Sequence, residues 1–196
     1  MPNWCSSNLT LTAKPEDLDK IENALNSALA KRVLPDEPQY FDNTWLGNLL
    51  AYTGMNREEV EKTDISCRGT IDDISRYEDS IVLYISSAWS PQFGALKVFL
   101  DYLDVHPEIT YIAEEFGSDI YVTNDPDYVD TFYLSTDKNN WYDLSEQDFR
   151  ETLVEQYGEH EEFHNLPVDK LIGWALNEFE DVCIHKCEYA DFDEWL

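Results

Sequence analysis

The sequence predicts an α+β protein whose first 115 residues follow a β-α-β-β-α-β order. Apolar residues alternate at period two in several short segments, and they recur every three or four residues in two longer segments between these. Prolines and polar turns such as RYED separate the segments. When each helix crosses between strands, this order is the ferredoxin-like plan, an antiparallel sheet with two helices on one face.

The apolar spacing predicts the first strand and the first helix. Residues 4–13 form a strand in this interpretation, because Cys5, Leu9, Leu11 and Ala13 fall on one face at period two. A central place in the sheet would hold this early segment. Pro15 suits the first turn of a helix over 15–31, where its missing N–H costs nothing. The apolar stripe of that helix contains Leu18, Ile21, Leu25 and Leu29.

A helical insertion is expected at about residues 40–62. Thr44 can cap a short helix, WLGNLLAYT, that stops at Gly54. Asn56 and Glu59 can then form a capping pair for one more turn of helix.

Two strands and a helix follow the insertion. Residues 65–75 and 80–88 are predicted to be neighbouring strands around the RYED turn. Ser90 is then expected as an N-cap, with Pro91 at the first helical position.

The sheet is expected to continue past this helix. A strand, a turn at Gly117 and another strand are predicted within EITYIAEEFGSDIYVTND, and YVDTFYLS is expected to be a further strand of the same sheet.

The remaining chain has its own signals. Ser145 and Asp148 form a capping pair before a helix, PVDKLIGWALNEF has a helical pattern, and VCIHKCEY suits a last strand. We therefore expect a ferredoxin-like domain over 1–125 and an acidic α/β extension over 126–196 that packs on it.

The charge balance is strongly negative. The chain has 41 acidic and 13 basic residues, a net charge of −28, and residues 101–196 hold 26 acidic and 4 basic residues. Because 43% of the residues are apolar and 14% are aromatic, we expect a folded chain and not a disordered one. Direct binding of nucleic acid or of an anionic membrane is not expected, since both need clustered Lys and Arg.

The location of the protein is expected to be cytoplasmic. No secretory signal and no membrane-spanning run is recognised, and four scattered cysteines do not suggest a disulfide scaffold. No cofactor fingerprint is present, so no cofactor is expected.

Several short motifs resemble one family. MPNWC with NLTLT, then CRG before a hairpin, AWSPQ before a helix and an EEFG turn are similar to the Api92-like family with its YubB-type ferredoxin-like domain, over about residues 1–125. These are uncharacterised proteins of phages, plasmids and bacterial mobile regions. The resemblance implies a ferredoxin-like fold and a mobile-element origin, but no activity. Members often carry a second proline where this chain has Gln92. The matching positions are Trp4, Cys5, Arg68, Gly69, Trp89, Ser90, Pro91 and Gly117.

Each matching position also has a structural interpretation. Trp89 is expected to be a core anchor, and Gly117 a turn residue with positive φ. Arg68 could bind a carboxylate or phosphate of a ligand with its fork of donors, but pairing with an internal carboxylate is favoured in so acidic a chain.

Two strings could bind metal. HEEFH at 160–164 matches H-E-x-x-H, in which His160 and His164 would be zinc ligands and Glu161 the general base, although Gly158 and Pro167 leave no room for a long helix. In CIHKC, Cys183, His185 and Cys187 would share one strand face and could complete a zinc site with His160 or His164. Buried structural thiols are the alternative.

The acidic side chains themselves are the leading candidates. Regularly spaced carboxylates can imitate the phosphates of a duplex and attract a basic nucleic-acid-binding surface. The predicted binding surface consists of Asp125, Asp127, Asp130, Asp137, Asp143, Glu151, Glu155, Glu159, Glu161 and Glu162.

Three functional hypotheses follow. The leading one is a non-enzymatic acidic binding protein of a phage or plasmid, which as a nucleic-acid mimic would inhibit a host DNA-handling or defence protein. The second is a zinc-binding protein or metallohydrolase that uses HEEFH. The third is an accessory domain with an unknown partner.

Overall fold

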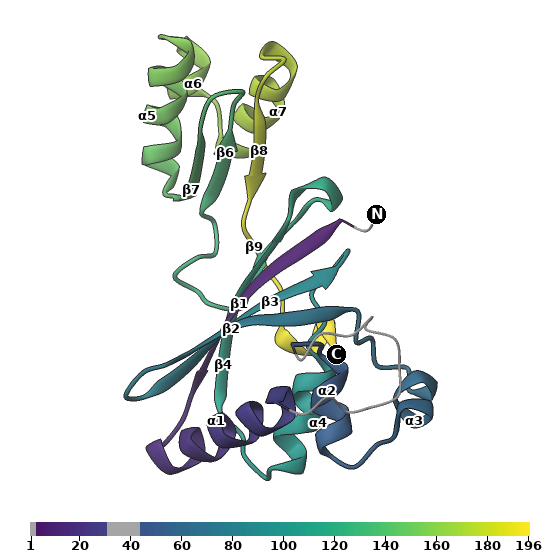
Figure 1. The fold of residues 1–196 in the computed structure, drawn as a ribbon. Coiled ribbons are helices and arrows are strands. Elements are labelled where there is room, and N and C mark those ends of the chain that lie inside the picture. Colours follow the sequence, from purple (N-terminus) through teal and green to yellow (C-terminus); the bar gives the residue numbers. More distant parts are fainter. Residues whose placement is uncertain (1–2, 31–43) are drawn as a thin grey trace. The chain divides into compact units, whose positions relative to one another are not determined.

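A computed structural model describes residues 3–30 and 44–196 (Figure 1). These residues form a mixed α+β structure with seven α-helices, a mixed sheet and a second, smaller sheet. The chain divides into two compact units: residues 1–120 together with 190–196 form the first, and residues 121–189 form the second. The expected boundaries were 125 and 126, with the whole C-terminal segment outside the first domain.

In the first unit, four antiparallel strands are adjacent in the order β2-β3-β1-β4. Their bounds are β1 Trp4–Thr12, β2 Gly69–Arg76, β3 Ser80–Ala88 and β4 Glu108–Glu115. The predicted strand at 4–13 is confirmed and is central, with Leu9 paired to Leu83 on one side and to Tyr111 on the other. Alternation sends Cys5 into the core and leaves Trp4 exposed.

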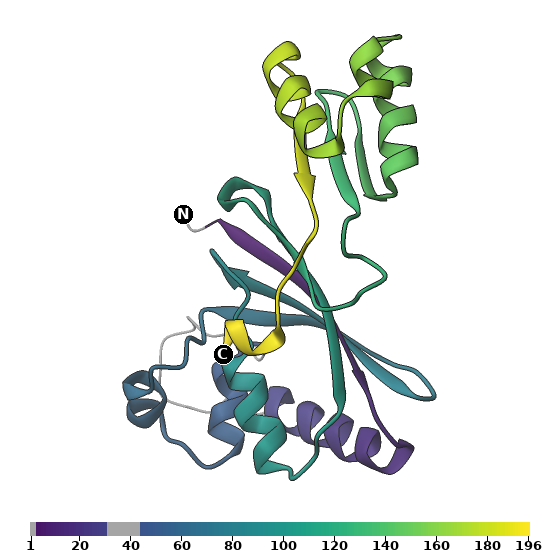
Figure 2. The same ribbon diagram turned by 180° about the vertical axis from the view of Figure 1, so that it is seen from behind.

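Helices α1 (Pro15–Ala30), α2 (Gly47–Tyr52) and α4 (Gly94–Tyr102) lie along one side of this sheet, as Figures 1 and 2 show from opposite directions. The buried side chains of β1 and β3 meet those of α1 and α4 in a largely aliphatic core. Its fully buried members include Leu9, Leu11, Leu18, Ile21, Leu25, Leu83, Leu96 and Phe99. The predicted helix at 15–31 is confirmed as α1, with Lys31 outside the described residues.

The predicted insertion contains α2 and α3 (Arg57–Lys62), while its residues 40–43 lie outside the described part of the chain. The capping pair is confirmed: the Asn56 side chain accepts from the Glu59 N–H, and the Glu59 carboxylate accepts from the Asn56 N–H. Thr44 is not a cap, because α2 begins only at Gly47 after Leu46. Gly54 ends this segment in a left-handed conformation with φ 101°.

The predicted cap at Ser90 and Pro91 is wrong. Helix α4 begins at Gly94 after Phe93, and no side chain caps it. The Ser90 carbonyl instead accepts a hydrogen bond from the Ser87 hydroxyl, so this segment closes onto β3 before the helix starts.

The C-terminal residues belong to the first unit. Phe192, in the short 3₁₀ helix Phe192–Trp195, stacks on Phe93 with ring centroids 5.0 Å apart. Tyr111 donates a hydrogen bond to the Ala190 carbonyl, and its hydroxyl oxygen accepts one from the Trp195 indole. These contacts explain why residues 190–196 separate from the expected extension.

The second unit has its own sheet, with strand order β7-β6-β8. The bounds are β6 Phe132–Ser135, β7 Asn140–Leu144 and β8 Cys183–Lys186. The expectation that residues 128–135 extend the first sheet is wrong, because β6 pairs with β7 and with β8. The predicted last strand is divided: β8 joins this sheet, and β9 (Glu188–Tyr189) pairs in parallel with β5 (Ile120–Thr123).

Three helices complete the second unit: α5 Glu146–Tyr157, α6 Glu161–Asn165 and α7 Val168–Glu178. The predicted cap of α5 is confirmed, since the Ser145 hydroxyl accepts from the Asp148 N–H at 3.2 Å. The core is rich in aromatic rings, with Phe132 stacked on Phe149 at 4.8 Å. The other buried members are Leu134, Leu153, Phe163, Leu171, Ala175 and Ile184.

Among the described residues, every helix is too short or too polar to cross a membrane.

Candidate functional site

Three of the ten predicted carboxylates line one groove in the second unit. The groove has a volume of 390 Å³ and runs along α5 to the turn before α6. Glu151 and Glu155 come from one face of α5, because residues four apart on a helix are neighbours. Glu159 follows the helix and completes the acidic side. The lining residues are Gln147, Arg150, Glu151, Val154, Glu155, Glu159 and His164.

The groove carboxylates are open to solvent. Glu151, Glu155 and Glu159 are all exposed, and Val154 supplies an apolar patch between them. Gln147 donates a hydrogen bond to Glu151 at 2.5 Å, which orders that carboxylate. His164 lies 3.0 Å from Glu159, and both side chains are more than half exposed.

Arg150 is the arginine of the groove, and its guanidinium is already engaged. It donates to the Phe163 carbonyl at 2.6 Å and to the Leu166 carbonyl at 3.0 Å, and it forms an ion pair with Glu146 at 2.6 Å. Only 16% of its side chain is exposed. Arg150 therefore joins α5 to the C-terminal end of α6, and Glu146 balances its charge, so the three groove carboxylates keep their negative field.

Two of the three aspartates between β5 and β6 have local partners for their carboxylates. The Asp125 carboxylate accepts the Asp127 N–H at 3.0 Å, which forms a tight turn. Asp130 lies 2.9 Å from the Lys186 ammonium. The hydrogen bond to Asp130 raises the pKa of Lys186 above its ordinary value. Asp130 is thus compensated, while Asp127 remains exposed.

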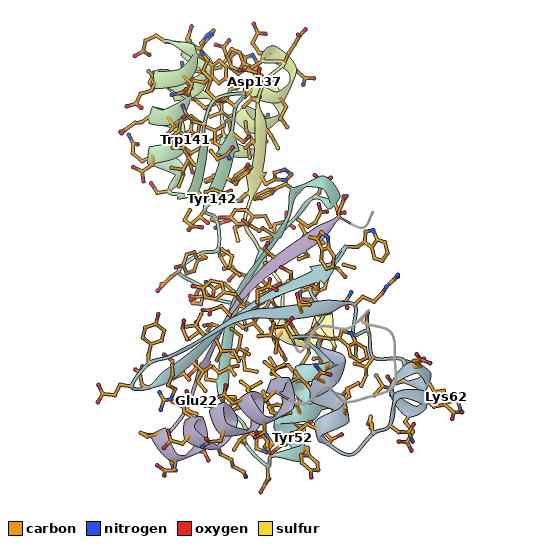
Figure 3. The ribbon with its side chains drawn as sticks, viewed as in Figure 1. Glu22, Tyr52, Lys62, Asp137, Trp141 and Tyr142 are labelled. Atoms are coloured by element: carbon orange, nitrogen blue, oxygen red, sulfur yellow. The ribbon has the colours of Figure 1, made fainter. Side chains whose placement is uncertain are left out.

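Asp137 and Asp143 lie on the hairpin of β6 and β7. Figure 3 shows Asp137 at the turn, with Trp141 and Tyr142 following on β7. Asp143 has φ 52° and accepts a hydrogen bond from the buried Tyr121 hydroxyl at 2.8 Å. Burial and the nearby Asp143 raise the pKa of Tyr121, so that phenol stays protonated. Asp143 has a structural partner, and Asp137 is exposed.

The HEEFH segment forms a helix of five residues, Glu161–Asn165. His160 precedes the helix in extended conformation, and its ring packs against Phe163 at 5.1 Å and Trp174 at 5.5 Å. His164 is directed to Glu159. The H-E-x-x-H arrangement needs both histidines on one helical face, and the break at His160 removes that geometry. Glu161 is exposed and accepts from the Asn165 side chain, and Glu162 is half-buried.

The CIHKC segment brings two of its three expected ligands together. Cys183 Sγ lies 3.2 Å from His185 Nε2 on β8. Cys187 lies beyond the end of β8 and is fully buried, and burial raises its pKa to about 12. Within residues 3–30 and 44–196, no group of three His, Cys, Asp or Glu side chains is placed to hold a metal ion.

Two of the motif residues, Arg68 and Trp89, are in contact on the first unit. Trp4 is paired with Ala88, and the Ala88 N–H donates to the Arg68 carbonyl. The Arg68 guanidinium lies 4.8 Å from the Trp89 ring centroid. The favoured pairing of Arg68 with an internal carboxylate is therefore replaced, in the described structure, by a cation–π contact.

Two expectations about motif residues are wrong. Trp89 is not a core anchor: 45% of its surface is exposed, and its φ of 68° turns the chain out of β3. Gly117 lacks a positive φ, since it lies in the 3₁₀ turn Phe116–Ser118 and the left-handed residue is Asp119.

Cys5 and Gly69 have structural roles. Cys5 is fully buried in β1. A Cβ on Gly69 would lie 2.5 Å from the Ser86 carbonyl oxygen, so β2 can approach β3 this closely only with glycine.

Four groove residues were not predicted from the sequence: Gln147, Arg150, Val154 and His164. The spacing of Gln147, Glu151 and Glu155 on a predicted helix was the available signal. The contact of His164 with Glu159 could not be predicted from neighbouring residues, because it depends on the turn at Gly158, where φ is 82°.

Comparison with known protein families, with characterised proteins and with solved structures found no match.

Proposed function

We propose that the chain is a non-enzymatic acidic binding protein that occupies the basic surface of a partner, as the phosphates of a nucleic acid would. The observation that carries this proposal is the grouping of Glu151, Glu155 and Glu159 along one open groove. In this proposal the partner is a host protein that handles DNA or belongs to a defence system, and the groove inhibits it.

The spacing of the carboxylates supports binding to a positively charged strip. Residues four apart on a helix are separated by about 6 Å along its axis. This is less than the Debye length of about 8 Å at physiological salt, so a lysine or arginine of the partner would feel neighbouring carboxylates together. Val154 between them offers a small apolar contact for the stem of such a side chain.

The balance of charge in the second unit supports the same proposal. Residues 121–189 contain 17 acidic and 4 basic residues, and two of the basic side chains, Arg150 and Lys186, are paired with Glu146 and Asp130. A field of this sign speeds association with a basic partner and weakens steeply as salt rises.

For the first unit we propose the ferredoxin-like plan and membership of the Api92-like family. Apart from the inserted helices α2 and α3, the order along the chain is β1-α1-β2-β3-α4-β4, and the order across the sheet is β2-β3-β1-β4; both support this plan. The short motifs support the family, and with it a phage or plasmid origin and a cytoplasmic site of action.

The test compares two variants of equal charge. The groove variant combines Glu151→Gln, Glu155→Gln and Glu159→Gln. The control variant combines Glu78→Gln, Glu108→Gln and Glu180→Gln, which are exposed carboxylates outside the groove. Wild-type protein immobilised in a bacterial lysate should retain proteins that bind nucleic acid, and either moderate salt or duplex DNA should release them.

The groove variant should lose at least about tenfold in affinity for a purified captured protein, and the control variant should lose much less. Equal losses in both variants would show that total charge and not the groove is responsible. Partners that do not handle nucleic acid, or that duplex DNA does not displace, would favour an accessory domain with another role.

A further inference from the structure

Strand β8 carries a cysteine and a histidine side by side on the helix-free face of the second sheet. Phe132, Leu134 and Ile184 point to the core beneath the helices. Since side chains alternate along a strand, Cys183 and His185 point to the other face. The thiol sulfur of Cys183 lies 3.2 Å from Nε2 of His185. β8 is also an edge strand of this sheet, and Cys183 on it is partly exposed.

The other three cysteines have a different environment. Cys5 and Cys187 are fully buried and Cys67 is 8% exposed, whereas Cys183 is only half-buried. Burial raises the pKa of both Cys5 and Cys67 to about 11, and that of Cys187 to about 12. These thiols are held as neutral, unreactive groups, because the thiolate is the nucleophile. Cys183 differs from them in both access and partner.

We propose that Cys183 and His185 form a reactive thiol site that undergoes exchange with low-molecular-weight disulfides. His185 Nε2 accepts the proton of the Cys183 thiol, and the thiolate attacks one sulfur of the disulfide. A bond forms between Cys183 Sγ and that sulfur, and the disulfide bond breaks. The leaving sulfur departs as a thiolate and takes the proton from His185. The site is independent of the acidic groove and of the function proposed for it.

The surroundings of the pair are aromatic and acidic. Tyr133 of β6 lies opposite His185, with ring centroids 6.2 Å apart, and its other neighbour is Tyr142 at 4.9 Å. Asp137 and Asp181 are at the end of the sheet where β8 begins, and together with burial they raise the pKa of Tyr157 to about 12.

Lys186 is the basic residue next to the pair on β8. It points to the opposite face by alternation, and its ammonium lies 2.9 Å from Asp130 and 3.7 Å from Asp169. His185, by contrast, has its ring nitrogen Nε2 within reach of the Cys183 thiol, at 3.2 Å.

The test follows modification of folded protein by glutathione disulfide near neutral pH, with peptide mass spectrometry to locate the mixed disulfide. Cys183 should be modified at least about tenfold faster than Cys5, Cys67 and Cys187. His185→Gln should slow the reaction of Cys183 by about tenfold. His106→Gln is the matched control, because His106 is exposed on the first unit and should leave the rate unchanged.

A second measurement uses wild-type protein alone. The rate for an unassisted thiol rises about tenfold per pH unit below its pKa of about 8.5. For Cys183 we expect a shallower rise between pH 6 and 8. A tenfold rise per unit, a rate equal to that of the buried cysteines, or an unchanged rate in a folded His185→Gln variant would each overturn the proposal.

Discussion

The two units differ in their density of charge and in the side chains that fill their cores. The first unit carries 24 acidic and 9 basic residues over 127 residues, and the second carries 17 acidic and 4 basic residues over 69. Their net charges of −15 and −13 are thus nearly equal, although the second unit is about half as long. The core of the first unit is mainly leucine and isoleucine, while the second has Phe132, Phe149 and Phe163 fully buried.

This difference shows how a small unit can tolerate dense charge of one sign. Self-repulsion destabilises a compact state, and a short chain buries a smaller fraction of its surface. Large rings offset both effects, because each aromatic side chain buries 150–250 Å². In the second unit they stack at short range, with Phe132 on Phe149 at 4.8 Å and Tyr157 on Phe179 at 3.9 Å. Charge is then available for binding at the surface.

High pH should produce the largest difference in stability between the two units. Burial raises the pKa of Cys187 in the second unit to about 12, and the pKa of Cys5 and of Cys67 in the first unit to about 11, all from 9.0. These thiols ionise in the unfolded chain above pH 9 but stay protonated in the folded one. Their stabilising effect is full below pH 9 and is lost as pH rises through the folded values.

We therefore expect the free energy of unfolding to fall by about 3 kcal/mol or more between pH 9 and pH 11. The second unit also holds Tyr121 and Tyr157, whose pKa values burial raises as well, so it should open first. Hydrogen exchange read peptide by peptide measures the two units separately. A constant stability up to pH 11 would contradict the buried state of these groups.

Phe192→Ala tests whether the last residues belong to the first unit. The ring is 9% exposed and stacks on Phe93, so its removal should leave a cavity and cost about 3 kcal/mol. The loss should appear in hydrogen exchange of α4 and β4, and the peptides of α5 to α7 should keep their protection. Leu196→Ala is the control, because Leu196 is exposed. Equal loss of protection in both units would contradict the division of the chain.

Local patterns predicted those elements whose signals lie within a few residues. The strand at β1, the helix α1 and the caps at Asn56 and Ser145 depend on neighbours in sequence, and all four are present. The predicted cap at Ser90 failed because a distant interaction decides that segment. The buried Gln92 side chain donates to the Ala88 carbonyl and accepts from the Arg68 N–H and the Ser66 hydroxyl.

The acidic site, too, could be predicted only where its signals are local in the sequence. The sequence identified Glu151, Glu155 and Glu159, since acidity and helical spacing are local properties. It did not assign β6 to a second sheet, because its partner β8 comes about fifty residues later in the chain. The sequence also did not pair Arg150 with the end of α6, since a backbone carbonyl acceptor has no signature in the sequence.

Arginine-to-lysine changes in the two units should give the smallest effect and the sharpest comparison. Arg150 donates to two carbonyls at 2.6 and 3.0 Å in addition to Glu146, so its planar fork is fully used. Lysine keeps the charge but cannot reach all three acceptors, and Arg150→Lys should cost about 2 kcal/mol. Arg76 of the first unit is the matched case, because it is also partly buried and paired with carboxylates.

The contacts of Arg76 are longer than those of Arg150. Its guanidinium lies 3.6 Å from Asp19 and 3.8 Å from Glu22, and it donates to the Ser80 carbonyl at 3.3 Å. A flexible ammonium can replace such loose pairing, so Arg76→Lys should cost less than about 1 kcal/mol in denaturant unfolding. If the two changes cost the same, then Arg150 acts only through its charge. The second unit would then be held by its aromatic core without the arginine bridge.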